Sequence, residues 1–129
     1  MPATAARIGA INLVMIPSSD QDRSIEFYVE KLGFEKRTDL PFGDSYRWVE
    51  VYPPSGTAGI ALAPPRESDA VGVQTGISLT TGDIDALHAE LLAAGVDVDA
   101  EVSRFGEPVP PMFWFRDPDA NTLLIVEVP

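Results

Sequence analysis

The chain has 129 residues, the length of one compact domain. Hydrophobic residues make up 45% of the sequence and charged residues 22%, which is ordinary for a globular protein. A formal net charge of −11 disfavours nucleic acid and anionic membrane surfaces as partners, because both require a basic surface on the protein.

Cysteine is absent, which excludes disulfide bonds, thiolate nucleophiles and thiolate metal sites. Histidine occurs once, at His88, in a predicted helix. The N-terminal segment lacks the apolar core and basic flank of a signal peptide, and no apolar run approaches the ~20 residues of a membrane-spanning helix. We therefore expect a cytoplasmic protein.

The first half of the sequence predicts a strand, a helix and three further strands. A nearly continuous apolar run over 9–17 is typical of a strand buried on both faces. Asp20 is placed to cap a helix over 22–32, which Gly33 ends. A strand over 34–39, a turn over 40–45 and a hairpin over 46–62 follow.

The second half repeats this order after a polar linker over 65–73. We predict a strand over 75–81, a helix capped by Asp83 and ended by Gly95, a short strand over 96–102, a loop over 103–111 and a hairpin over 113–128. Asp20 and Asp83 are 63 positions apart, and Gly33 and Gly95 are 62 apart. This near-constant spacing predicts a duplicated βαβββ unit within one domain of residues 1–129, with modules over 8–64 and 74–129.

Two motifs resemble the signatures of a known family. Residues 19–28, Ser-Asp-Gln-Asp-Arg-Ser-Ile-Glu-Phe-Tyr, with Leu-Gly-Phe at 32–34, resemble the opening signature of the glyoxalase/bleomycin-resistance family in the vicinal oxygen chelate superfamily. Residues 115–121, Phe-Arg-Asp-Pro-Asp-Ala-Asn, resemble its closing signature, in which members usually have glycine in place of Ala120. The resemblance spans about 8–128. It implies an α+β fold in which two βαβββ modules form a curved mixed sheet around a cavity, often in a homodimer.

The resemblance also implies where a metal would bind. Enzymes of the superfamily typically hold a divalent ion with one His, Glu or Gln from each of four strands. The corresponding positions here are Leu13, Gly76, Leu124 and either Ile60 or Ala61. None has a nitrogen or oxygen donor in its side chain, so we expect no metal and no cofactor. The metal-dependent glyoxalase and dioxygenase activities are therefore set aside.

The same positions identify the strand faces toward the expected cavity, because strand residues alternate between faces. The candidate ligand-binding residues on those faces are Leu13, Met15, Tyr46, Trp48, Glu50, Ser78, Met112, Trp114, Arg116 and Leu124. We predict that Trp48 and Trp114 face one another's half of the molecule, where they could hold a planar or cationic ligand between them. Arg116 could bind a carboxylate with both ends of its guanidinium, and Glu50 is the candidate catalytic base.

Each of these residues also has a structural explanation. The two indoles could fill the core. Glu50 and Arg116 could pair with each other or face solvent. The loop over 103–111 could be a lid over the cavity or a rigid connector.

Three functions remain open at this point. The first is a metal-free protein that binds a hydrophobic or aromatic small molecule, for sequestration or resistance. The alternative is a metal-independent isomerase, cyclase or lyase that uses Glu50 as general base. The third is a scaffold that only dimerises. In each case we expect a homodimer, with no nucleic-acid or membrane partner.

Overall fold

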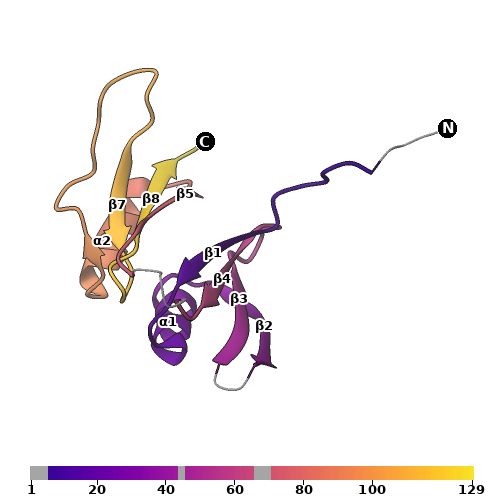
Figure 1. The fold of residues 1–129 in the computed structure, drawn as a ribbon. Coiled ribbons are helices and arrows are strands. Elements are labelled where there is room, and N and C mark those ends of the chain that lie inside the picture. Colours follow the sequence, from indigo (N-terminus) through magenta and orange to yellow (C-terminus); the bar gives the residue numbers. More distant parts are fainter. Residues whose placement is uncertain (1–5, 44–45, 66–70) are drawn as a thin grey trace.

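The structure, a computed structural model, describes residues 6–43, 46–65 and 71–129. Its first half contains β1 (Leu13–Pro17), α1 (Gln21–Glu26), the π-helical turn η1 (Phe27–Lys31), β2 (Glu35–Phe42), β3 (Tyr46–Tyr52) and β4 (Gly59–Ala63). Its second half contains β5 (Gln74–Thr81), α2 (Ile84–Ala93), β6 (Asp97–Val98), β7 (Met112–Arg116) and β8 (Thr122–Glu127). Both halves have the order βαβββ, which confirms the predicted duplication (Figure 1).

The strands form two four-stranded mixed sheets. The first sheet has the order β1-β4-β3-β2 and the second has the order β5-β8-β7-β6. In each sheet the first strand of the module pairs in parallel with the last strand, and the other pairings are antiparallel. The α+β class and the paired modules are therefore as predicted. The predicted linker over 65–73 includes 66–70, which lie outside the described residues, so its bounds stay a prediction.

The two helices begin and end as the sequence indicates. The Asp20 carboxylate accepts a hydrogen bond from the Arg23 amide at 3.1 Å, and the Asp83 carboxylate accepts one from the Ala86 amide at 3.1 Å. Gly33 and Gly95 follow the helices with φ of 78° and 80°, a left-handed conformation that favours glycine. In the described part of the chain, no helix is long and apolar enough to cross a membrane.

Three strand predictions are corrected. Strand β1 begins at Leu13, and Met15 in its middle is 68% exposed, so the expected burial on both faces is wrong for a single chain. Strand β2 continues through the predicted turn to Phe42, because Leu40 and Phe42 pair with residues of β3. Strand β6 has only two residues, after which the pairing with β7 is no longer regular.

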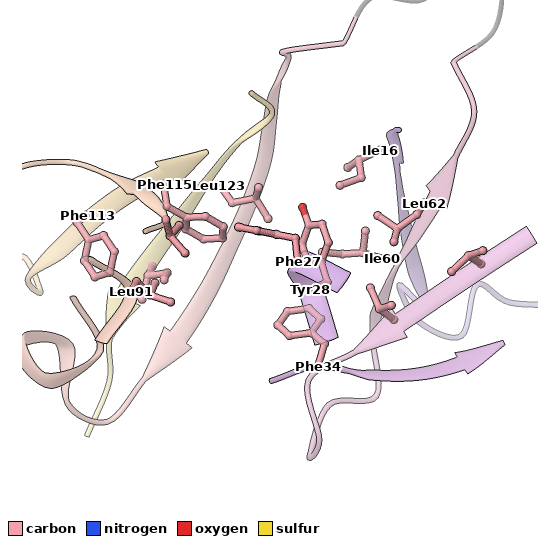
Figure 2. Packing of buried hydrophobic residues seen from close by; sticks show 14 of the residues in the cluster. Ile16, Phe27, Tyr28, Phe34, Ile60, Leu62, Leu91, Phe113, Phe115 and Leu123 are labelled. Carbon is pink, nitrogen blue, oxygen red and sulfur yellow. The ribbon is translucent and has the colours of Figure 1, made fainter. Parts of the chain in front are cut away.

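One hydrophobic core joins the two modules. It contains side chains from both sheets and from the helices, including Val49, Ile60, Phe113, Phe115 and Leu123. In Figure 2, Phe27 and Tyr28 of η1 lie between the Ile60 side and the Phe115 side of this core. The rings of Phe27 and Phe115 have their centroids 6.3 Å apart. The helical layer of the first module therefore packs against the inner face of the second sheet.

The turn between β7 and β8 also connects the modules. The Asp117 carboxylate accepts hydrogen bonds from the backbone amides of Asp119 and Asn121, both at 2.9 Å, and from the Tyr28 hydroxyl at 2.9 Å. Burial, and then the nearby Asp117 carboxylate, raise the pKa of Tyr28 well above its ordinary value, so the hydroxyl remains a donor. The Asn121 amide nitrogen donates to the Pro17 carbonyl at 2.9 Å. The closing motif of the sequence therefore holds the modules together.

Candidate functional site

The central strands β3 and β7 each have one buried face and one partly exposed face. Val49 and Val51 of β3 are fully buried in the shared core, and Trp48 and Glu50 point to the opposite face. In β7, Phe113 and Phe115 are fully buried, and Met112, Trp114 and Arg116 are only half-buried. The alternation is as predicted, and neither indole fills the core. Contact with a ligand stays a prediction.

The outer face of the first sheet carries a group of apolar and aromatic side chains. Ala61 pairs with Met15 on one side and with Glu50 on the other, which places the three in one row across the sheet. Leu40 pairs with Trp48. The other predicted residues there are Leu13, which is half-buried, and Tyr46, which is exposed.

Phe42 was not among the predicted site residues, although it belongs to this face. Its ring centroid is 6.1 Å from that of Trp48 and 5.7 Å from that of Tyr46. Because we predicted a turn over 40–45, Phe42 was not assigned to a strand or to either face of the sheet. The period-two continuation from Thr38 through Leu40 to Phe42 is the signal that indicates a longer strand.

Glu50 is held by the two aromatic residues next to it on the same face. The Trp48 Nε1–H donates to Glu50 Oε2 at 2.7 Å, and the Tyr52 hydroxyl donates to Glu50 Oε1 at 2.8 Å. Glu50 and Arg116 therefore do not pair with each other, which was one of the structural explanations. The hydrogen bond from Tyr52 to Glu50 also raises the pKa of the Tyr52 hydroxyl, followed by the effect of desolvation.

The outer face of the second sheet is built from three neighbouring strands. Leu124 of β8 pairs with Ser78 of β5 on one side and with Trp114 of β7 on the other. Met112 lies in the same face of β7, two residues before Trp114. These four predicted residues therefore form a continuous patch that has an indole at one side and a hydroxyl at the other.

Arg116 is engaged by carboxylates of its own chain. Its Nη1 lies 3.0 Å from Asp99 Oδ1, and its Nη2 lies 3.0 Å from Asp97 Oδ1. The hydrogen bond with Asp97 raises the pKa of Arg116, and the same bond lowers the pKa of Asp97. Both ends of the guanidinium are thus engaged within the chain, which gives Arg116 a structural role, and the two-point grip on a ligand carboxylate stays a prediction.

The two outer faces do not face each other within one chain. The buried residues of both sheets point into the shared core, with Phe27 and Tyr28 between them (Figure 2). Trp48 and Trp114 lie on the opposite side of their strands, so they point away from that core. The prediction that each indole faces the other half of the molecule is therefore wrong for a single chain.

A groove of about 920 Å³ lies elsewhere, on the core side between the modules. It is lined by the loop 53–59, by β5 and by apolar residues of both helical layers, among them Phe34, Leu87 and Leu91. Of the predicted ligand-binding residues, only Ser78 lines it. Sequence alternation thus identified two surfaces and did not identify this groove.

The residues at the family's metal positions do not fit a metal ion. Leu13 pairs with Gly59, and Leu124 lies between Ser78 and Trp114, so the aliphatic side chains occupy the expected ligand places. Across the described ranges, no three His, Asp or Glu residues gather in a group that could hold a metal. His88 contacts the Asp99 carbonyl through Nε2 at 2.7 Å and packs edge-on against Phe113. These contacts give His88 a structural role.

Residues 10–125 match the model of the Glyoxalase/Bleomycin resistance protein/Dioxygenase superfamily. The chain belongs to this superfamily. Among its relatives, YurT of Bacillus subtilis is 32% identical over 118 residues, which cover 84% of this chain and 91% of YurT.

Solved structures of other proteins share the fold. A member from Sphaerobacter thermophilus is 36% identical, with a TM-score of 0.84 over 94% of this chain and 98% of that protein. TnmS3, an antibiotic binding protein from Streptomyces sp. CB03234, is 31% identical, with a TM-score of 0.82 over 96% of this chain and 99% of TnmS3. This chain is thus similar over almost its full length to a protein that binds an antibiotic.

Proposed function

We propose that this protein binds a flat, hydrophobic or aromatic small molecule without a metal ion, in a sequestering or resistance role. The observation that carries the proposal is the pair of partly exposed indoles on the outer faces of the two sheets. Trp48 lies beside Phe42, and Trp114 lies beside Leu124. Surfaces of this kind, apolar with few polar groups, are typical of small-molecule sites.

The similarity to TnmS3 supports the same proposal. TnmS3 is described as an antibiotic binding protein, and its structure aligns with nearly the whole chain. The donor-free residues Leu13, Gly76 and Leu124 favour binding without a metal over the metal-dependent activities that occur in the superfamily. The acidic chain favours no nucleic-acid or anionic membrane partner, and we keep the cytoplasm as its proposed location.

The binding site is proposed to lie between two copies of the chain. Each outer face is open in a single chain, and exposed apolar residues lie just before β1, at Ile11, and within it, at Met15. Among the described strands, β1 and β5 each have a free edge. A second copy would cover these surfaces, and Trp48 of one chain would then face Trp114 of the other.

The alternative function, an isomerase, cyclase or lyase with Glu50 as general base, has weaker support. A general base must lie within hydrogen-bond reach of the substrate proton that it removes. In this structure each oxygen of Glu50 already accepts a bond, one from Trp48 and the other from Tyr52. The geometry therefore favours binding over proton abstraction.

The proposal is tested by titrating the protein with two flat tricyclic probes, the cation 9-aminoacridine and the neutral acridone. We expect calorimetric binding of at least one probe together with a change in tryptophan emission. Trp48→Ala and Trp114→Ala should each weaken binding by ~1–3 kcal/mol, the scale of a lost aromatic contact in a desolvated site. Leu92→Ala, at an exposed position of α2, is the matched control and should bind as the wild type does.

The same variants also test the assignment of the faces. Trp114 is half-buried, so Trp114→Ala should destabilise the fold by less than the ~3–5 kcal/mol expected for a tryptophan locked in a packed core. Binding that is unchanged in both tryptophan variants would place the ligand elsewhere, for instance in the groove between the modules. Such a result would overturn the proposed site.

A further inference from the structure

Glu50 lies between Trp48 and Tyr52 at alternate positions of β3, and its carboxylate accepts a hydrogen bond from each. Trp48 donates to Oε2 at 2.7 Å and Tyr52 donates to Oε1 at 2.8 Å, so each ring is tied to a different carboxylate oxygen. Hydrogen bonds to an ionised group are stronger than neutral ones. The three side chains therefore form one rigid unit on the outer face of the first sheet.

The Tyr52 ring is fixed from two further directions. It lies directly on the backbone of Gly59 in the neighbouring strand, where an added Cβ would come within 2.7 Å of the ring. The Arg37 guanidinium lies 4.5 Å from the centroid of the same ring. Arg37 is held in turn by the carbonyls of Gly56 and Pro54, both at 3.0 Å. The loop after β3 thus braces the phenol that bonds to Glu50.

The Trp48 indole has one firm polar anchor, its bond to Glu50. The ring of Phe42 lies beside the indole, with 6.1 Å between ring centroids and an interplanar angle of 47°. An apolar contact of this kind leaves a partly exposed ring free to change rotamer, whereas the Nε1–H bond fixes the direction of the ring edge. The orientation of Trp48 therefore depends on Glu50.

We infer that Glu50 is a positioning residue, which holds the Trp48 indole and the Tyr52 phenol in place as a preformed platform for a flat ligand. The inference rests on the proposed function and deepens it. A platform whose rings are already ordered loses little side-chain entropy when a ligand binds, and this strengthens binding. Glu50 acts through its two neighbours, and the role requires no proton transfer.

Glutamine at this position distinguishes positioning from the other roles of a carboxylate. Its carbonyl oxygen can accept from Trp48 Nε1–H, and its amide nitrogen can donate to the Tyr52 hydroxyl oxygen, so both links survive without the charge. Alanine removes both links. A general base, or a direct partner of a cationic ligand, requires the carboxylate and would fail in either variant.

The first experiment needs no ligand. In a Trp114→Phe background, Trp48 is the only tryptophan, and its time-resolved anisotropy reports the motion of the indole. We expect Glu50→Ala to add a fast component of ring motion and Glu50→Gln to leave the decay unchanged. Gly59→Ala should displace the Tyr52 ring from β4 without altering Glu50 itself. Glu30→Ala, at an exposed position of η1, is the control. An unchanged decay in Glu50→Ala would overturn the inference.

The second experiment measures affinity for 9-aminoacridine and acridone in chains that retain Trp114. We expect Glu50→Ala to weaken binding of both probes about tenfold, which corresponds to 1.4 kcal/mol. Glu50→Gln should remain within about threefold of the wild type. Equal losses in both variants, confined to the cationic probe, would show direct recognition of charge and would contradict positioning. If neither probe binds to the wild type, the proposed function fails for this class of ligand, and the anisotropy still decides the role of Glu50.

Discussion

Ala120 has a backbone conformation that an alanine rarely adopts. Its φ is 62°, in the left-handed region, at the place where the family's closing signature usually has glycine. An L-residue in this region is strained by ~1–2 kcal/mol, and glycine avoids that strain at an entropic cost of ~0.5–1 kcal/mol in the unfolded chain. We predict that Ala120→Gly raises the free energy of unfolding by about 0.5–1 kcal/mol in urea titrations.

A second alanine provides the control for this prediction. Ala94 ends α2 with a φ of −80°, a conformation that alanine adopts without strain. Ala94→Gly should therefore lower stability, because only the entropic cost remains. If both substitutions shift the urea midpoint in the same direction, the strain at Ala120 is not the cause.

Asp39 connects the stability of the first sheet to pH. Its carboxylate accepts from Arg47 Nε at 2.9 Å and from Lys36 Nζ at 2.8 Å, and these bonds, that of Arg47 first, lower the pKa of Asp39 to about 2. Because the pKa is lower in the folded state, this stabilisation is present above the ordinary value of 3.8 and is lost as the pH falls toward 2. We predict that Asp39→Asn makes the fall in melting temperature between pH 4 and pH 2 shallower.

The comparison that checks this prediction is the same pair of proteins, wild type and Asp39→Asn, at low and at high salt. Asp39 is itself partly exposed, so the difference should be small and should shrink in high salt. A slope that Asp39→Asn leaves unchanged would contradict the role of the ion pairs.

Single residues were predicted best where their chemistry is local. The caps Asp20 and Asp83, the glycines after the helices and the outward placement of Trp48 follow from rules that act within a few residues. The partners of Arg116 could not be predicted in this way, because Asp97 on β6 and Asp99 just after it belong to a neighbouring segment, whose register the sequence does not fix. The contact of Glu50 with both Trp48 and Tyr52 also depends on side-chain rotamers.

At the scale of elements, the turn between β7 and β8 connects the modules through Asn121. This fully buried side chain donates to the Pro17 carbonyl and to Asp117, and it accepts from the amides of Gly72 and Val73. Removing this side chain leaves several of these backbone and carboxylate groups without a hydrogen-bond partner and shielded from water. We predict that Asn121→Ala lowers the free energy of unfolding by at least ~2 kcal/mol, since each buried unsatisfied group costs ~1–3 kcal/mol.

Asn12 offers a matched substitution for this test. It is an asparagine before β1, with an exposed side chain, so Asn12→Ala should change the urea midpoint little. If the two variants lose similar stability, the turn does not connect the modules energetically. In that case Asn121 would be only a local turn residue.

The number and order of the helices and hairpins were predictable from the sequence. The residues at which the strands end were harder to predict. Capping residues and turn residues mark the helices and the closing hairpin directly in the sequence. The ends of β2 and β6 depend on pairing with β3 and β7, which is a tertiary effect. The shortness of β6 is an example: Asp99 uses its carboxylate to accept from the Trp114 amide at 3.0 Å, and regular pairing stops there.

At the scale of the whole molecule, the two modules share one core, and both outer faces are left open. The sequence predicted the faces correctly, because alternation within a strand is a local property. It could not predict that the helical layer of the first module packs against the second sheet, since this depends on contacts such as Phe27 with Phe115 across the two halves. The predicted pocket residues are therefore divided between two surfaces that meet only if a second copy is present.

The most direct test of the proposed composite site combines two defective chains in one dimer. Trp48→Ala and Trp114→Ala chains, carrying different tags, are co-expressed, and the mixed dimer is isolated by successive purification on both tags. If each site combines Trp48 of one copy with Trp114 of the other, one site of the mixed dimer retains both indoles and the second site has neither.

Calorimetric titration of this mixed dimer with the acridine probe that the wild type binds gives the decisive result. We predict half the wild-type number of sites, each with wild-type affinity, whereas both parent dimers bind weakly at every site. A mixed dimer that binds no better than its parents, or a chain that binds the probe fully as a monomer, would contradict the account.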